Sequence, residues 1–265
     1  MRVSELIIYP IKSTAPLSHT STEVENKGLR FDRNWALFDE NKQLITGRTH
    51  PQLLDLQSRF LPQQLRIQQA NGNSIHIPLE YPETTVEEFG FFSRSVPGIS
   101  HRQEINDWFS DYLGFQCQLV FMNDSVQRFV LAKHGGKAGD LLNYADQAPL
   151  LLVSTASVDD LNQRLEHPVS IANFRPNVVM EGSPAFEEHR WKRIQIGEVV
   201  FDVNQACKRC IFINIDPITK QKGKEPLKTL ATYRKDEEGD VIFGVHLIPR
   251  TYGKIHVDDS ITVLK

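Results

Sequence analysis

Long apolar runs, cysteines and an excess of one charge are all scarce in this sequence. Its apolar runs fall well short of the ~20 residues of a membrane-spanning helix, so we expect no membrane association. Three cysteines are too few for a disulfide framework, and the N-terminus lacks the apolar segment of a signal peptide, which together predict a cytoplasmic protein. The 30 basic and 33 acidic side chains give a net charge of −3, which argues against nucleic acid as a partner.

Several common catalytic patterns are also missing. The sequence has no glycine-rich dinucleotide or phosphate loop, no His-Glu-x-x-His zinc motif and no Gly-x-Ser-x-Gly elbow. What remains is an ordinary globular composition, with 40% hydrophobic and 24% charged residues. The length of 265 residues suits one large domain or two small ones.

The apolar pattern is that of a β-rich protein. Apolar residues form short runs or alternate between turn residues, as at 3–9, 34–39, 65–67 and 75–79. The Asn-Gly pair at 71–72 lies between two alternating runs and predicts a hairpin. Many strands with few helices favour a barrel or sandwich over a Rossmann array, which needs regular strand–helix alternation.

Helical periodicity is confined to short segments. We expect helices over 103–113, with Gly114 after its end, over 157–165 from a capping box at Ser157, and over 226–234. Residues 80–100 show little periodicity and are interpreted as a long loop.

The densest chemical motif is Cys207-Lys208-Arg209-Cys210. Zinc needs about four ligands, and the third cysteine, Cys117, is isolated. A thioredoxin-like pair would open a helix, whereas this pair precedes a strand-like run. One cysteine could instead work as a thiolate, which the two neighbouring cations favour. On pattern alone, two small residues at a strand start explain the pair equally well.

Other polar clusters are weaker signals when taken singly. Residues 9–13, 28–35 and 173–177 combine cations with turn residues and could bind an anion. Residues 134–140 are glycine-rich and could cover a site, and residues 220–224 form a local basic run. Each is better explained alone as an ordinary turn, surface pair or solvated loop.

Nine segments stand in a recognisable order: residues 9–13, 28–35, 47–53, 144–149, 173–177, 207–210, 216–217, 225–234 and 243–244. Together they resemble one family, the MOSC-domain proteins with an N-terminal β-barrel extension, which includes the mitochondrial amidoxime reducing component and the bacterial YcbX-type proteins. The resemblance implies a mainly β fold with short helices. It implies an N-terminal β-barrel-like domain over residues 1–115 and a MOSC β-barrel domain over residues 116–265.

The resemblance also implies a molybdenum cofactor with a single pyranopterin. Cys210 matches the family's metal ligand and is the expected catalytic residue, while the role of Cys207 is left open. The positions that hold the pterin or its phosphate are matched by Lys12, Ser13, Arg33, Asp146, Arg175 and Asn177. Because these residues come from both halves of the chain, we expect the cofactor to lie between the halves.

The implied reaction is the reduction of small N-hydroxylated compounds. The chain has no cysteine after Cys210, so it cannot hold a plant-type iron–sulfur cluster, which needs four. Electrons are therefore expected from a separate ferredoxin- or flavin-type protein. Two alternatives remain: a carrier of the cofactor or of sulfur, as a Cys210 persulfide, and an interaction module with a vestigial site.

One departure from the family pattern concerns the segment after the cysteine pair. Much of the family has a Thr-Thr-Val-Asp-Pro-like sequence there, whereas this chain has Asn214 in place of a threonine. The substitution puts the polarity of the substrate pocket in question.

Overall fold

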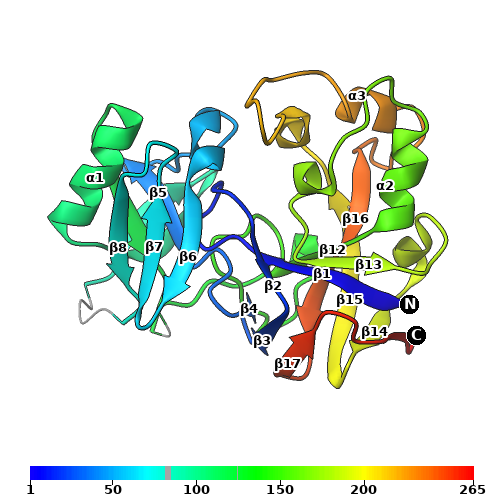
Figure 1. The fold of residues 1–265 in the computed structure, drawn as a ribbon. Coiled ribbons are helices and arrows are strands. Elements are labelled where there is room, and N and C mark those ends of the chain that lie inside the picture. The colour runs from blue at the N-terminus through cyan, green and yellow to red at the C-terminus, as the bar shows by residue number, and fades with distance from the viewer. Residues whose placement is uncertain (81–84, 124) are drawn as a thin grey trace. The chain divides into compact units, whose positions relative to one another are not determined.

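The computed structural model describes residues 1–80, 85–123 and 125–265. The described residues are mainly β-strand with three α-helices and short 3-10 helices, which confirms the predicted fold class. They form two compact units, whose elements are labelled in Figure 1. Unit 1 comprises Met1–Ile8, Ser18–Arg30 and Phe129–Lys265, and unit 2 comprises Tyr9–Leu17 and Phe31–Arg128.

Unit 1 is built on an eight-stranded sheet with the order β18-β14-β15-β16-β12-β13-β1-β2. The first strand of the chain pairs antiparallel with β13, which itself pairs parallel with β12 (Figure 1). The strands are β1 (Arg2–Ile8), β2 (Leu17–His19), β12 (Leu150–Ser154), β13 (Val178–Glu181), β14 (Arg193–Ile196), β15 (Val199–Lys208), β16 (Ile242–Pro249) and β18 (Ile261–Val263).

A smaller sheet and several short helices complete unit 1. The sheet contains β3 (Ser21–Glu25), β4 (Gly28–Leu29) and β17 (Gly253–His256). The helices are α2 (Thr155–Asn162), α3 (Leu227–Leu230), η2 (Ala132–His134), η3 (Ile171–Phe174), η4 (Glu187–Arg190) and η5 (Ile211–Asn214). One hydrophobic cluster joins Leu161 of α2, Phe174 of η3, Ile213 of η5 and Leu230 of α3. This shared core fixes η3 and η5, which carry the candidate site.

Unit 2 contains two open sheets, in the orders β5-β11-β10-β9 and β6-β7-β8. Its elements are β5 (Trp35–Asp39), η1 (Pro51–Asp55), β6 (Gln57–Leu61), β7 (Gln64–Gln68), β8 (Ser74–Pro78), β9 (Glu87–Phe91), β10 (Arg94–Ser100), α1 (Gln103–Leu113) and β11 (Cys117–Phe121). The predicted hairpin is confirmed: Ile67 pairs with Ile75 across the turn, where Gly72 has a φ of +90°.

Helix α1 confirms the periodicity over 103–113. Ile105, Phe109 and Leu113 are buried on one face, as a 3.6-residue repeat requires. Gly114 then adopts the left-handed conformation and donates its N–H to the carbonyl of Ser110 at 2.8 Å.

The predicted loop over 80–100 is wrong where the structure describes it. Strands β9 and β10 form a hairpin in which Phe89 pairs with Val96. The apolar alternation is carried by only a few buried side chains, and Pro97, which lacks an N–H, breaks the usual strand signature. Residues 81–84 of the predicted loop lie outside the described residues.

Two helix boundaries also differ from prediction. Helix α2 begins at Thr155, and Ser157 lies inside it rather than at its N-cap. The hydroxyl of Ser157 instead donates to Glu188 Oε1 at 2.9 Å and accepts the N–H of Phe186 at 2.8 Å. A tertiary partner therefore replaces the predicted local cap. Helix α3 is also shorter than the predicted span of 226–234.

The two units do not correspond to one cut in the chain, because unit 1 gathers three separate segments. The predicted domain boundary after residue 115 stays a prediction. Among the described residues, no helix is long and apolar enough to cross a membrane.

Candidate functional site

Cys210 lies at the end of β15, where the chain turns into η5. It is the residue immediately before that helix and has an extended backbone, with φ −113° and ψ 179°. Its side chain is exposed, unlike those of Cys117 and Cys207. The preceding Arg209 donates its backbone N–H to the carbonyl of Val241 at 2.7 Å. The structure thus presents one accessible thiol on a backbone that is fixed just before it.

The 173–177 and 207–210 motifs are joined in unit 1. Asn173 donates its side-chain N–H groups to the carbonyls of Ile213 at 3.0 Å and Ile215 at 3.3 Å. Arg209 donates from Nη2 to the carbonyl of Phe174 at 2.8 Å. These bonds hold η3 against η5, so the two motifs form one local structure despite their separation in the sequence.

Arg175 belongs to the same structure. It follows η3 in the left-handed conformation, with φ 55°, and its side chain is half-buried. Its guanidinium carbon lies 5.5 Å from the ring centre of Phe212 in η5. A ring attracts such a cation through its quadrupole and adds no negative charge. The predicted role of Arg175 in cofactor binding stays a prediction.

Of the two cysteines in the motif, Cys207 is the one whose sulfur contacts Arg209. The Nη1 of Arg209 donates to the Cys207 sulfur at 2.9 Å, and Cys207 is buried. Burial raises the pKa of this thiol, but the charge of Arg209 and the contact with His246 outweigh it and lower the pKa to about 6. The lowered pKa favours the thiolate form of Cys207, and the sulfur accepts the hydrogen bond of Arg209, the residue next to Cys210.

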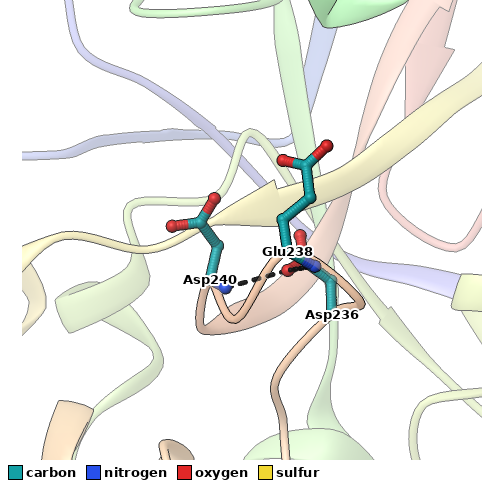
Figure 2. A group of neighbouring side chains, drawn as sticks. All are labelled: Asp236, Glu238 and Asp240. Carbon is teal, nitrogen blue, oxygen red and sulfur yellow. Dashed lines mark hydrogen bonds between the residues drawn. The ribbon is translucent and has the colours of Figure 1, made fainter.

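Lys208 is held by an acidic turn over residues 236–240. Its ammonium nitrogen lies 2.7 Å from Asp240 Oδ2 and 3.6 Å from Asp236 Oδ2, and Glu238 is its third partner. Figure 2 shows these three acidic side chains, with Asp236 accepting a backbone N–H from Asp240 at 2.8 Å. The three carboxylates lie close enough together to hold a metal ion, but the lysine already neutralises part of their charge. The turn therefore fixes the end of β15.

Asn177 is buried among strands. Its side-chain oxygen accepts the N–H of Leu151 at 3.1 Å, and its side-chain nitrogen donates to the carbonyl of Ile7 at 3.1 Å. The amide thus bridges β1 and β12. Its predicted role in cofactor binding stays a prediction beside this structural role.

Asn214 has a role in the fold. Its side-chain oxygen accepts the N–H of Leu227, the first residue of α3, at 2.9 Å. Its backbone carbonyl accepts the N–H of Gly223 at 3.0 Å. The amide therefore positions α3, and the effect of this departure from the family pattern on pocket polarity stays a prediction.

In unit 2, two of the predicted cofactor residues have a left-handed backbone. The φ angles are 73° at Ser13 and 49° at Arg33, conformations that non-glycine residues adopt at a cost. Arg33 donates to Asp32 Oδ2 at 2.6 Å and lies over the ring of Tyr9, 4.4 Å from its centre. Asp32 also accepts the N–H of Tyr9 at 2.8 Å. The chain is thus held in an unusual conformation at both positions.

Lys12 belongs to a cationic cluster on two rings of unit 2. Its nitrogen lies 5.0 Å from the ring centre of Phe91 and 5.8 Å from that of Phe92. Arg128 lies over Phe91 at 4.3 Å, and Arg48 lies over Phe92 at 4.6 Å. Lys12 and Arg128 are both less than a tenth exposed. The sequence places Arg48 in one of the family segments and gives no sign of a role for Arg128, because the contacts depend on rings in β9 and its turn.

The glycine-rich segment over 134–140 is bound to β15 rather than free to cover a site. Lys137 donates to Asp202 Oδ2 at 2.8 Å, and its backbone N–H donates to Asp140 at 2.8 Å. A Cβ at Gly136 would lie 2.3 Å from the carbonyl oxygen of Val130, so a larger residue does not fit there.

Family models match both parts of the chain. Residues 1–116 match the MOSC N-terminal beta barrel domain, and residues 139–262 match the MOSC domain. Over 99% of its length the chain is 32% identical to mitochondrial amidoxime-reducing component 1 of Mus musculus, covering 82% of that protein. This chain belongs to the MOSC-domain family of the mitochondrial amidoxime-reducing components.

A second relative has a different name. The chain is 31% identical over 93% of its length to molybdenum cofactor sulfurase of Oryza sativa subsp. japonica, of which it covers 32%. Among solved structures, YUAD protein from Bacillus subtilis aligns over 98% of the chain with a TM-score of 0.45 and 12% identity.

The predicted site residues of this MOSC protein divide between the units. Arg175, Asn177 and Cys210 lie in unit 1, where the 173–177 and 207–210 motifs meet. Asp146 lies in unit 1 as well and is exposed. Lys12, Ser13 and Arg33 lie in unit 2. A cofactor between the two halves stays a prediction.

Proposed function

We propose that this MOSC protein is a molybdenum-cofactor-dependent reductase of N-hydroxylated compounds, with Cys210 as the protein ligand of the metal. The observation that carries the proposal is the exposed Cys210 thiol at the junction of two fixed motifs. The family membership supports it, since relatives that are about 30% identical are named amidoxime-reducing components.

The residues fit such a cofactor in their chemistry. A thiolate is a soft ligand that suits molybdenum, and Cys210 is the exposed thiol of the chain. Arg175 in unit 1 and the Lys12 cluster in unit 2 are cations seated on aromatic rings, which suits them to bind a phosphate. When bound, the cofactor would supply the metal centre for two-electron removal of oxygen.

The proposed reaction balances as follows. An amidoxime takes up two electrons and two protons and yields an amidine and one water molecule, with cleavage of the N–O bond. In this proposal Cys210 holds the metal, Arg175 and Asn177 orient the pterin, and Lys12, Ser13 and Arg33 bind its phosphate. Asp146 is the remaining proposed contact to the pterin. The electrons come from a separate redox protein, and we place the reaction in the cytoplasm.

Metal content tests the ligand assignment directly. Protein purified from a host that makes the cofactor should carry molybdenum, and Cys210→Ser should lose most of it. Cys117→Ser is the matched control, because this buried cysteine belongs to unit 2 and should leave the metal content unchanged. Equal molybdenum in the wild type and Cys210→Ser would show that the assignment is wrong.

A second candidate function rests on the resemblance to molybdenum cofactor sulfurase. In that case Cys210 would carry a persulfide sulfur and pass it on without reducing a substrate. Intact-protein mass spectrometry distinguishes the two: one extra sulfur atom on Cys210 without molybdenum supports the carrier. Molybdenum together with reduction of benzamidoxime by an artificial donor supports the reductase.

A further inference from the structure

The segment after Cys210 forms a short, ordered projection, which we call the lysine loop (residues 211–224). Ile215 and Lys222 form an antiparallel bridge, and Asp216 donates its N–H to the carbonyl of Gln221 at 3.0 Å. The carboxylate of Asp216 accepts the N–H groups of Ile218 and Thr219 at 2.8 and 2.7 Å. The loop is therefore a built hairpin with Ile218 near its tip.

The lysine loop presents apolar side chains to solvent. Ile218 is 81% exposed, more than the other large hydrophobic residues whose exposure the structure describes, and Ile211 is 62% exposed. Ile211 directly follows Cys210, so one of these side chains adjoins the proposed metal ligand. Two large apolar side chains exposed in one short loop offer contact area to a partner, since exposed apolar patches with polar rims mark interaction sites.

The same loop and the following helix carry exposed cations. Lys222, Lys224 and Lys228 are exposed, and among the described residues none of the three lies within 4 Å of a carboxylate. Over residues 211–224 there are three lysines and a single acidic residue, Asp216, whose oxygen is engaged by the backbone. This contrasts with Lys208, which is paired with the acidic turn.

We propose that the lysine loop is the docking site for an acidic electron-carrier protein. The inference rests on the proposed reductase function, since it assigns the surface through which that site receives its electrons. Weak redox encounters use small interfaces with an apolar centre and a charged rim, and opposite charges steer the partners together. The loop carries both exposed isoleucines and exposed lysines, beginning at the residue after Cys210.

The electron balance requires repeated docking. A plant-type ferredoxin carries one electron on its [2Fe–2S] cluster. Two reduced ferredoxins would therefore dock in turn for each substrate, which takes up two protons and releases one water molecule. Two oxidised ferredoxins would leave. A weak, salt-sensitive interface suits this exchange better than a tight one.

The test is binding of a plant-type ferredoxin, an acidic protein, measured by fluorescence anisotropy with the full chain. This readout does not depend on a loaded metal site. We expect binding that weakens as salt is raised, and the double variant Lys222→Glu/Lys224→Glu to weaken it about tenfold or more at low salt. Lys254→Glu is the matched control, because this exposed lysine lies on β17 of the same unit.

Turnover then separates this inference from the proposed function. With the ferredoxin as donor, the double variant should reduce benzamidoxime more slowly, while its rate with a small artificial donor should equal that of the wild type. Ferredoxin binding and turnover that are unchanged in the double variant would overturn the docking site. Binding of vesicles with anionic phospholipid, without binding of ferredoxin, would overturn it in favour of a lipid surface. If the wild type reduced no benzamidoxime with either donor, the reductase function itself would be contradicted.

Discussion

The end of β15 and the Lys12 cluster hold their cations in different ways. Near β15 in unit 1, Lys208 is paired with the acidic turn, Arg209 with Cys207 and Arg250 with Asp202. In unit 2, Lys12, Arg128 and Arg48 lie on the aromatic rings of Phe91 and Phe92. Ion pairs therefore characterise the first region and contacts with rings the second.

The difference teaches what each group of cations can do. A carboxylate or thiolate neutralises its partner and makes the pair part of the fold. A ring attracts a cation through its quadrupole but adds no negative charge, so the positive potential survives for a ligand. By this criterion we expect the cations on rings, which are Lys12, Arg48, Arg128 and Arg175, to contribute to an anion site, whereas Lys208 and Arg209 shape the loop before Cys210.

The largest expected effect comes from removing an anion in unit 1. Asp202 accepts hydrogen bonds from Lys137, Arg193 and Arg250 at 2.7–2.8 Å and is mostly buried. Asp202→Asn should lower the free energy of unfolding by about 2–3 kcal/mol, less than for a fully buried pair, because two of the cations can reach solvent. Urea unfolding measures this. Asp160→Asn, which removes an exposed pair with Arg164, should change little.

The stabilisation that Asp202 provides should decrease when the pH is lowered. Burial raises the pKa of Asp202, but hydrogen bonds from Lys137, Arg193 and Arg250 outweigh it and hold the pKa well below the usual range. The stabilisation is then complete above the unfolded pKa of about 3.9 and disappears as the pH falls through the lower folded value. The difference between the wild type and Asp202→Asn should stay constant from neutral pH to about pH 5 and shrink below about pH 4. A difference that grew on acidification would contradict this account.

In unit 2 the corresponding change removes a ring. Phe91→Leu should cost about 1–2 kcal/mol of unfolding free energy, from lost packing and from the loss of the ring beneath Lys12 and Arg128. Phe109→Leu in α1 is the control, since it removes an equally buried ring that the structure pairs with Trp108 rather than with a cation. If Phe91→Leu lowered the unfolding free energy by the same amount with and without phosphate in the buffer, that would argue against a cationic site that an anion stabilises.

A spectroscopic titration tests the pairing of Cys207. In a Cys210→Ser background, the thiolate absorbance should rise with a midpoint near pH 6, because burial raises the pKa of the remaining Cys117 to about 11. Arg209→Gln should move the midpoint upward. Since the folded pKa lies below the unfolded value of about 8.5, this group should stabilise the fold increasingly between pH 6 and 8.5. A flat absorbance over that range would refute the thiolate.

The smallest effect is expected at the acidic turn. Lys208 keeps a third of its side chain exposed, and such pairs contribute little to stability. Lys208→Met should leave the urea midpoint nearly unchanged. A large shift would mean that the turn determines the fold of unit 1 more strongly than the geometry indicates.

Local signals in the sequence predicted the local structure well. The Asn71-Gly72 hairpin and the end of α1 at Gly114 depend on backbone preferences within a few residues, and both are confirmed. The helix start predicted at Ser157 is wrong because the local cap pattern competes with a tertiary partner. Glu188 provides that partner by accepting the hydrogen bond of the Ser157 hydroxyl. The loop predicted in place of strands β9 and β10 is wrong because Pro97 and neighbouring glycines obscure the alternation of apolar and polar residues there.

The candidate site likewise combines features that the sequence predicts with features that only the fold reveals. The sequence order of the motifs was enough to establish the family, and the contact of Asn173 with η5 joins two of them. The preference of Arg209 for Cys207 could not be read from four adjacent residues, because it depends on which cysteine is buried. The rings beneath Lys12 lie about eighty residues further along the chain, and only the fold brings them there.

The pairing of β1 with β13 in the large sheet has a consequence for synthesis of the chain. Its first residue, Arg2, faces Glu181, which follows 179 residues later. At 5–20 residues per second, the ribosome needs roughly 10–35 s to deliver that partner strand. During this interval β1 lacks its β13 partner, and all of unit 2 is made before β13 emerges. Because an unpaired apolar strand can pair wrongly with another chain, β1 is a segment that a chaperone should protect until β13 emerges.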